Sequence, residues 1–339
     1  MGDSPTLVDR LDRPFRDLRI SVTDRCNFRC TYCMPKEIFG PGFNFLPRSE
    51  ILTFEEITRL VSLFAAHGMQ KIRLTGGEPT LRSDLPRLIE MLHRAAPYLD
   101  LAMTTNASRL RDLAQPLADA GLDRITVSLD SVNDEIFRRM NDVDFPVSQV
   151  LEGIDAAAAA GMGPIKINAV VQKGVNDHTI SEIARHFQGS GHIVRFIEFM
   201  DVGTTNGWKL DQVISGQQII ETIHAALPLE PIASAYQGEV AQRWRYQDGS
   251  GEIGVITSVT QTFCGDCTRA RLSADGKLYT CLFASSGEGL RGPLRAGVSD
   301  AALATNLQQL WSRREDRYSE RRSDATAGLP KVEMSFIGG

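Results

Sequence analysis

The stretch TDRCNFRCTYC, residues 23–33, places three cysteines on one short loop with the spacing Cys26-x3-Cys30-x2-Cys33. The loop directly follows a β-branched run, Leu18 to Val22, which predicts a strand. It therefore lies at the carboxyl end of a strand, where folds built of βα units assemble their sites. Three thiolates are one ligand fewer than a 4Fe-4S cluster normally takes, so this spacing predicts a cluster with one open iron that can bind a small molecule.

A second trio of cysteines, Cys264-x2-Cys267-x13-Cys281, lies near the end of the 339-residue chain and completes its six cysteines. The alternatives to a second cluster are buried structural cysteines, disulfides and zinc sites. Disulfides are rare in cytosolic proteins, and a structural zinc site wants four ligands where each trio supplies three. Buried structural cysteines would scatter along the chain. Two 4Fe-4S clusters are the better interpretation.

Short β-branched runs alternate with helical stretches through the first 200 residues, a pattern typical of parallel βα units. The predicted strands are Leu18 to Val22, Lys71 to Leu74, Leu101 to Thr104, Arg124 to Leu129, Lys166 to Val171 and Ile193 to Phe199. Thr53 and Glu56 predict a capping box at the start of one helix, with Gly68 after its end. Asp177 is expected to cap the helix before the sixth strand. Periodicity alone fits either a partial barrel or a doubly wound sheet.

The alternation stops after Met200. Beyond it we expect a linker over 201–214, a helix over 215–227, a hairpin over 243–259, a second hairpin turning at 274–277 and a helix over 300–311. We therefore predict two domains: residues 1–210 carry the first cysteine trio, and residues 211–339 carry the second.

Charge and hydropathy exclude some classes of partner. With 37 basic and 42 acidic residues the formal net charge is −5, whereas binding to bulk nucleic acid normally requires a strongly basic domain. No apolar run approaches the roughly 20 residues of a membrane span, and the charged N-terminus does not resemble a signal peptide. The sequence predicts a cytoplasmic protein that binds neither nucleic acid nor membrane.

Several basic residues occupy strand positions where apolar side chains are the norm. Arg269 and Arg271 are two residues apart, so on a strand they share one face, and Lys71 and Arg73 do the same. Any one of them alone is better read as a solvated surface charge. Their clustering favours a local site for a phosphate-bearing ligand.

Residues 23–33 resemble the signature of radical S-adenosylmethionine enzymes, and Thr75-Gly76-Gly77-Glu78-Pro79 resembles the loop that holds the methionine moiety in that family. The resemblance implies a partial (βα)6 TIM-like barrel with S-adenosylmethionine chelated to the open iron. One electron then cleaves this cofactor to a 5′-deoxyadenosyl radical, which abstracts hydrogen from a substrate. The implied cofactor contacts are Tyr32, Gly77, Ser128 and Met200. The glycines would let backbone approach the ligand, and Glu78 could receive its ammonium group.

Residues 264–271, CGDCTRAR, and 275–283, DGKLYTCLF, resemble the second cluster site of the GTP 3′,8-cyclase family of molybdenum cofactor biosynthesis, and Gly338-Gly339 resembles its flexible tail, which is needed for activity. The resemblance spans Asp17 to Gly339. It implies that the second open iron binds guanine and that Arg269 and Arg271 are catalytic. The implied GTP contacts are Arg19, Arg73, Thr104, Lys166, Arg269, Ala270 and Arg271. Ala107 departs from the pattern, because glycine is expected there.

The reaction that this resemblance implies is that of a lyase. The deoxyadenosyl radical removes the hydrogen at the ribose 3′ carbon of GTP, the new radical attacks carbon 8 of guanine, and reduction and protonation give 3′,8-cyclo-7,8-dihydro-GTP. The implied partners are an electron donor and the cyclic pyranopterin monophosphate synthase that receives the product; the chain would be a monomer or a homodimer.

Two rival functions remain open. The first is another radical S-adenosylmethionine enzyme of the peptide-modifying or sulfatase-maturing type, although these typically carry more C-terminal cysteines. The second is a non-catalytic iron-sulfur electron carrier, but such a protein gains nothing from an open iron.

Overall fold

The computed structural model describes residues 6–236, 238–322 and 329–338. All twelve strands in these residues form one sheet, in the order β12-β11-β10-β1-β2-β3-β4-β5-β6-β9-β8-β7. The six predicted strands are β1 (Asp17–Ser21), β2 (Lys71–Thr75), β3 (Asp100–Thr105), β4 (Arg124–Ser128), β5 (Lys166–Val171) and β6 (Ile193–Glu198). They pair in chain order, and every pair is parallel.

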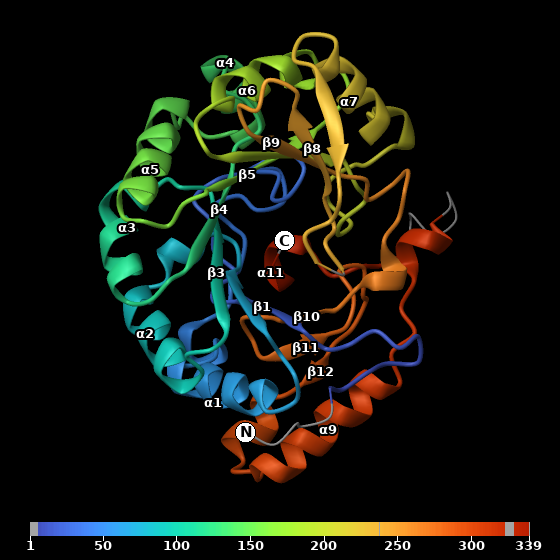
Figure 1. The fold of residues 1–339 in the computed structure, drawn as a ribbon. Coiled ribbons are helices and arrows are strands. Elements are labelled where there is room, and N and C mark those ends of the chain that lie inside the picture. The colour runs from blue at the N-terminus through green and yellow to red at the C-terminus, as the bar shows by residue number, and fades with distance from the viewer. Residues whose placement is uncertain (1–5, 237, 323–328, 339) are drawn as a thin grey trace.

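Helices follow these strands and cover the outer face of the curved sheet (Figure 1). They are α1 (Phe54–Ala65), α2 (Leu85–Ala95), α3 (Leu110–Asp119), α4 (Asp134–Asn141), α5 (Val147–Ala159) and α6 (Ile180–Phe187). Along each strand the side chains alternate: Leu18 and Ile20 of β1 are buried in the core, while Arg19 between them lines a central cavity. Because the helices lie on one face, the architecture is the partial (βα)6 barrel and not a doubly wound sheet.

The predicted N-terminal cap is confirmed at α1 and wrong at α6, and α1 ends at Ala65 with Ala66 as its C-cap, before the predicted cap Gly68. Thr53 and Glu56 form the capping box before α1. Asp177, expected to cap α6, instead lies in the 3-10 helix η3 (Asp177–Thr179), and its Oδ1 accepts a hydrogen bond from the Gly174 amide at 2.8 Å. The turn of 3-10 helix moves the start of α6 to Ile180, which puts Asp177 too far upstream to cap it.

The C-terminal strands extend the barrel sheet at both edges. The predicted hairpins are confirmed: β8 (Gln242–Tyr246) pairs antiparallel with β9 (Glu252–Ile256), and β10 (Arg269–Leu272) with β11 (Lys277–Tyr279). β9 is parallel to β6, and β10 is parallel to β1. The remaining elements are β7 (Leu229–Ile232), β12 (Glu288–Gly289), α7 (Gly216–His224), α8 (Arg291–Arg295), α9 (Asp300–Ser312) and α11 (Met334–Ile337). The sheet is thus continuous across residue 210, and the division into two domains there stays a prediction.

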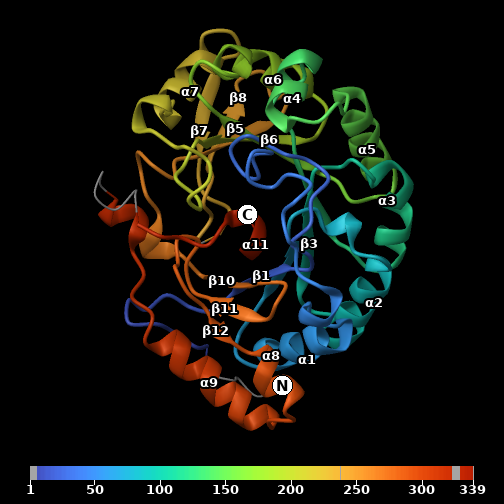
Figure 2. The same ribbon diagram turned by 180° about the vertical axis from the view of Figure 1, so that it is seen from behind.

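The C-terminal helix α11 lies inside the barrel, and views from the two opposite sides both show it at the centre (Figures 1 and 2). Met334 and Ser335 line the central cavity. Gly338 lies so close to β2 that a Cβ on it would come within 2.2 Å of the Thr75 methyl group, and its φ of +77° also favours glycine. Within the described residues no helix is long and apolar enough to span a bilayer.

Candidate active site

Both cysteine trios line the same central cavity, although they are more than 230 residues apart in the chain. All six thiols are free, so disulfides are excluded in this structure. In the described part of the chain, no three Cys, His, Asp or Glu side chains lie close enough to hold one metal ion. A single zinc ion therefore does not fit either trio, whereas a 4Fe-4S cluster takes each thiolate on a different iron and accepts more widely spaced ligands.

The loop after β2 holds the first cysteine loop by backbone contacts. The Gly77 amide donates to the Thr23 carbonyl at 2.9 Å, and the Glu78 amide donates to the Arg25 carbonyl at 2.8 Å. A Cβ on Gly77 would lie 2.3 Å from the Arg25 carbonyl oxygen and 3.0 Å from the Cys26 nitrogen. The glycine is therefore required by this close approach of two backbones.

Glu78 ties the loops after β2 and β3 together. Its carboxylate accepts hydrogen bonds from the Thr80 amide and hydroxyl, the Thr105 hydroxyl and the Asn106 amide, at 2.6 to 3.0 Å. Burial raises the pKa of this carboxyl group. Both carboxylate oxygens of Glu78 thus accept hydrogen bonds from donors within the chain, and these bonds position the loops that border the cavity.

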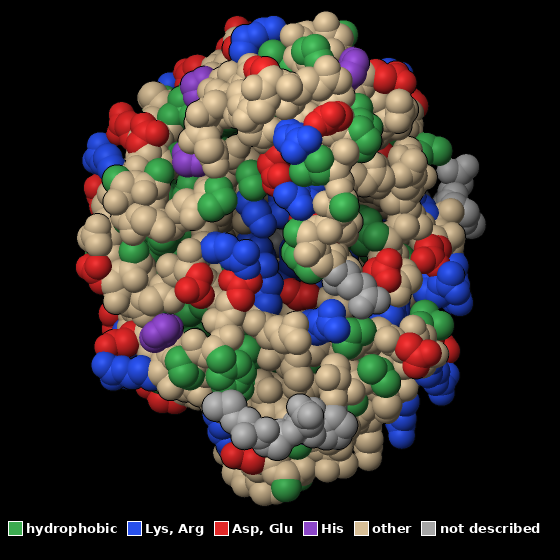
Figure 3. All heavy atoms as spheres, viewed as in Figure 1, with side chains coloured by type: hydrophobic (Ala, Val, Ile, Leu, Met, Phe, Trp, Pro, Cys, Tyr) green, Lys and Arg blue, Asp and Glu red, His purple; other side chains and the backbone are tan. Residues whose placement is uncertain are grey.

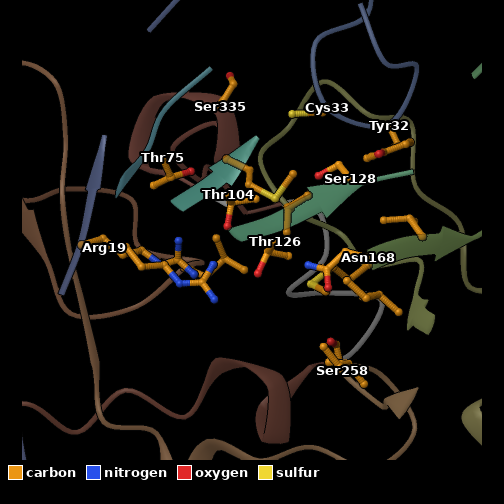
Figure 4. Close-up of a pocket in the computed structure, with 18 of the residues that line it drawn as sticks. Arg19, Tyr32, Cys33, Thr75, Thr104, Thr126, Ser128, Asn168, Ser258 and Ser335 are labelled. Atoms are coloured by element: carbon orange, nitrogen blue, oxygen red, sulfur yellow. The ribbon is translucent and has the colours of Figure 1, made fainter. Parts of the chain in front are cut away.

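The four residues predicted to contact S-adenosylmethionine all line the cavity; they are Tyr32, Gly77, Ser128 and Met200. Tyr32 is fixed by a hydrogen bond that its hydroxyl donates to Oδ2 of Asp130 at 2.8 Å. Burial raises the pKa of Asp130 to about 6. Figure 4 shows Tyr32, Cys33 and Ser128 bordering one space with Ser335 of α11.

Three arginines stand level with one another on three adjacent strands. Arg19 of β1 is paired in register with Arg73 of β2 on one side and Arg271 of β10 on the other. All three side chains line the cavity, as does Arg269, two residues before Arg271. We call Arg73, Arg19 and Arg271 the arginine row. Figure 3 shows Lys and Arg side chains gathered around the hollow at the centre of this face.

Within the described residues, no ion pair balances the positive charge of the row. No carboxylate within the described residues forms a salt bridge with any of the five arginines that line the cavity, which are Arg19, Arg73, Arg195, Arg269 and Arg271. Burial, followed by repulsion from the neighbouring arginines, lowers the pKa of Arg19 well below its ordinary value. The same two causes lower the pKa of Arg271 to about 9. Adjacent like charges are destabilising, so the electrostatics of the cavity favour the binding of an anion beside these arginines.

Two of the predicted GTP contacts do not line the cavity. Lys166 lies at the first residue of β5, and Ala270 has its side chain in the hydrophobic core, because strand alternation turns it away from Arg269 and Arg271. Thr104 does line the cavity, and its hydroxyl accepts a hydrogen bond from Arg73 at 3.1 Å. The roles assigned to Lys166 and Ala270 stay predictions.

Sequence reasoning missed Arg195 on β6. Its side chain lines the cavity, and its Nε is buried without a hydrogen-bond partner in the described structure. Asn168 on the neighbouring strand β5 is paired in register with Arg195 and has an equally unpaired Oδ1. The signal was present in the sequence, since a charged residue stands between the apolar Val194 and Phe196.

The cysteines of the two trios lie in different electrostatic surroundings. Burial raises the pKa of Cys26 to about 12, and the amide of Phe28 and the side chain of Asn106 are its donors, at 3.4 and 3.9 Å. Burial would also raise the pKa of Cys267, but the cations Arg269 and Arg314 lower it to about 6. Only the second trio has arginine side chains as donors to sulfur among the described residues.

The tail is attached beside the predicted cofactor contact Met200. Lys331 donates to Oδ2 of Asp201 at 2.8 Å, and Glu333 accepts hydrogen bonds from the Thr204 amide and from the hydroxyls of Thr204 and Thr205 at 2.8 to 2.9 Å. Gly339, the last residue of the predicted diglycine tail, lies outside the described residues.

Ala107 is one of only four non-glycine residues with positive φ among those described, at +60°. Glycine adopts this left-handed conformation without the steric cost that alanine incurs. The departure from the expected glycine thus falls on a position where the backbone favours glycine.

Comparison with known proteins gives a consistent answer. A sequence profile of the radical SAM superfamily matches residues 20–187, and one described as Molybdenum Cofactor Synthesis C matches residues 192–320. The chain is 54% identical to a GTP 3′,8-cyclase of Acidothermus cellulolyticus and 47% identical to one of Staphylococcus saprophyticus. Both alignments cover 98% of this chain, and they cover 98% of the first relative and 99% of the second. The chain belongs to the GTP 3′,8-cyclase family. Its resemblance to that family is thereby confirmed.

Solved structures support the radical SAM fold of this GTP 3′,8-cyclase family member. The crystal structure of Streptococcus suis SuiB bound to S-adenosylmethionine superposes with a TM-score of 0.60 at 13% identity, covering 80% of this chain and 62% of that protein. At this identity the likeness shows the fold alone.

Replacing the central arginine of the row should stabilise the ligand-free chain. Arg19→Met removes a half-buried cation that stands between two others, so we expect the free energy of unfolding to rise by about 1 kcal/mol. Urea denaturation of the purified chain measures this. Arg94→Met is the control, because Arg94 is an exposed partner of Glu90. A lower free energy of unfolding for Arg19→Met would show that other groups of the chain already offset the repulsion between these arginines.

Adding a methyl group at Gly77 should loosen the first cysteine loop. Because the new Cβ would overlap backbone atoms that cannot rotate away, we expect Gly77→Ala to lower the free energy of unfolding by about 2 kcal/mol. Gly42→Ala, with open space around its Cβ, should change it little. Equal urea midpoints for the two variants would contradict the close approach seen here.

Proposed function

We propose that the chain is a radical S-adenosylmethionine enzyme, a lyase that converts GTP to 3′,8-cyclo-7,8-dihydro-GTP in the first step of molybdenum cofactor (molybdopterin) biosynthesis. The observation that carries the proposal is the central cavity, where two cysteine trios are joined by arginines that no carboxylate in the described chain neutralises. Family membership at 54% identity over nearly the full length supports the same activity.

The cysteines of each trio would hold one 4Fe-4S cluster: Cys26, Cys30 and Cys33 the first, and Cys264, Cys267 and Cys281 the second. Free, cavity-lining thiols with three donors per site suit a cluster with one open iron. When bound, the first cluster supplies the electron that cleaves S-adenosylmethionine to the radical that abstracts hydrogen. The chain contributes Tyr32, Gly77, Ser128 and Met200 to hold that cofactor.

The arginine row would bind the triphosphate of GTP. Guanidinium groups bind phosphate oxygens with paired, charge-assisted hydrogen bonds, and those of the row line the cavity without an ion pair to any carboxylate in the described chain. Thr104 holds Arg73 in place, and Arg195 adds a fifth cation to the wall of the cavity. Arg269 and Arg271 stand beside the second trio, where guanine would bind, so we assign them the direct catalytic role. Lys166 would add charge at the amino end of β5.

The rival functions explain less of the cavity. A peptide substrate has no need of a row of arginines, and an electron carrier has no need of a cavity. We further propose that an electron donor and a cyclic pyranopterin monophosphate synthase are partners, that the enzyme is a monomer or homodimer, and that it works in the cytoplasm. The six free cysteines support a reducing compartment.

Activity is tested anaerobically on the reconstituted enzyme with S-adenosylmethionine, reductant and GTP. We expect both 5′-deoxyadenosine and a cyclised nucleotide by mass spectrometry, with ATP in place of GTP giving no cyclised product. Cys26→Ala should reduce both products to background. Deoxyadenosine formed while GTP stays intact would assign the radical chemistry to another substrate.

Binding of GTP should be accompanied by proton uptake. Burial, followed by nearby arginines, lowers the pKa values of Lys71 and Lys166 to about 7, so both are largely neutral at about pH 8.5. A bound triphosphate favours their charged forms and raises these pKa values, so affinity should fall as pH rises above 7. Calorimetry in two buffers of different ionisation enthalpy measures the uptake.

Lys166→Met should reduce the number of protons taken up, whereas Lys36→Met, an exposed lysine paired with Asp142, should not. Identical heats in both buffers would mean that the triphosphate does not lie near these lysines.

A further inference from the structure

Arg314 contacts the second cysteine trio from outside the cavity. It follows α9, its side chain is 1% exposed, and it does not line the cavity. Its Nη2 donates to the Cys267 sulfur at 3.2 Å, and its Nη1 donates to the Cys267 carbonyl at 2.7 Å. Its Nε donates to the carbonyl of Thr280, next to Cys281, at 3.1 Å. One guanidinium thus contacts Cys267 and the residue that precedes Cys281.

Arg13 contacts the third cysteine, Cys264, from the N-terminal segment. Its Nη1 donates to the carbonyls of Cys264 and Asp316, both at 2.8 Å, and its side chain is 2% exposed. The two arginines together therefore hold backbone at or beside all three cysteines, which come from two separate stretches of the chain.

Asp9 links the two arginines. Its Oδ2 accepts from Nε of Arg13 at 2.7 Å and from Nη1 of Arg314 at 3.0 Å, and its side chain is fully buried. The Trp311 ring lies against Arg314, 4.5 Å from its guanidinium carbon, and the indole N–H donates to the Arg13 carbonyl. Nε, Nη1 and Nη2 of Arg314 thus each donate at least one hydrogen bond, and the carboxylate of Asp316 lies 3.5 Å from Nε.

A purely structural role does not explain this arrangement. Buried ion pairs are on average no more stabilising than apolar side chains of similar volume, and backbone carbonyls alone would satisfy the guanidinium groups. The N–H to sulfur contact adds a different property. Hydrogen bonds to ligand sulfurs stabilise the more negative, reduced state of an iron-sulfur cluster and so raise its reduction potential.

The first trio has no equivalent. Among the described residues, the donors to sulfur in this trio are uncharged, namely backbone amides such as that of Phe28 and the side-chain amide of Asn106, which contact Cys26. The two trios would therefore hold clusters of different potential, because within the described part of the chain only the second has a cation that donates to sulfur from outside the cavity.

We propose that Arg314 is a positioning residue that raises the reduction potential of the C-terminal cluster through its hydrogen bond to Cys267, with Asp9 and Arg13 holding it in place. This rests on the proposed function in one respect, namely that both trios carry clusters. It is independent of the substrate, because Arg314 does not line the cavity.

The test is a redox titration of the full-length, doubly loaded enzyme, followed by electron paramagnetic resonance. The Cys26→Ala chain, which keeps only the C-terminal trio intact, identifies which couple belongs to the C-terminal cluster. In Arg314→Met we expect the midpoint potential of that couple to become more negative, while the N-terminal couple stays unchanged. Arg314→Lys keeps the charge but not the fork of donors, so it should shift the same couple in the same direction by less.

Arg10→Met is the matched control, since Arg10 joins the same two segments through an exposed ion pair with Glu315 and contacts no cysteine. It should leave both couples unchanged. An unaltered C-terminal couple in Arg314→Met overturns the proposal; if that variant does not fold, an unaltered couple in Arg314→Lys does so. A wild-type chain that binds iron at one trio only would instead contradict the two-cluster part of the proposed function.

Discussion

The parallel pairing of β1 with both β2 and β10 is the constraint on which the site depends. β1 leads directly into the first cysteine loop, β2 leads into the glycine loop that holds it, and β10 follows the first two cysteines of the second trio. Pairing these three strands in one register brings segments from the two ends of the chain to one cavity. The same register places Arg73, Arg19 and Arg271 side by side. The hydrogen bonds between these strands therefore determine both the fold and the arrangement of charge in the cavity.

Strand alternation explains how a barrel interior can carry this charge without losing its core. The outward residues of the strands, such as Leu18, Ile72 and Ile167, pack under the helices, while most inward residues of β1 to β4 are polar. Each arginine of the row is thus flanked in sequence by apolar residues that bury its backbone. The row stores unfavourable electrostatic energy in the ligand-free chain, which an anion would release on binding.

The strands, both hairpins and most of the site could be predicted from the sequence because their signals are local. Alternation of polar and apolar residues predicts a strand, and the close spacing of cysteines predicts a loop that binds a cluster. Three features needed tertiary information. Arg195 belongs to no motif, and although its charge between apolar neighbours marks an inward position, only the structure places it on the cavity wall beside Asn168. Asp177 lies in a turn of 3-10 helix and does not cap α6. The predicted start of that helix therefore differs from the observed start by a few residues, which helix propensity does not resolve. The network of Asp9, Arg13 and Arg314 joins residues about 300 apart, so no spacing could have indicated it.

The C-terminal segment that contains α11 contacts the chain close to the predicted cofactor site. Glu333 is bonded to Thr204 and Thr205, directly beyond Met200, and Gly338 lies against Thr75, directly before the glycine loop. The tail therefore contacts the chain next to two of the segments that would hold S-adenosylmethionine. Since Met334 and Ser335 also line the cavity, this segment is part of the cavity wall.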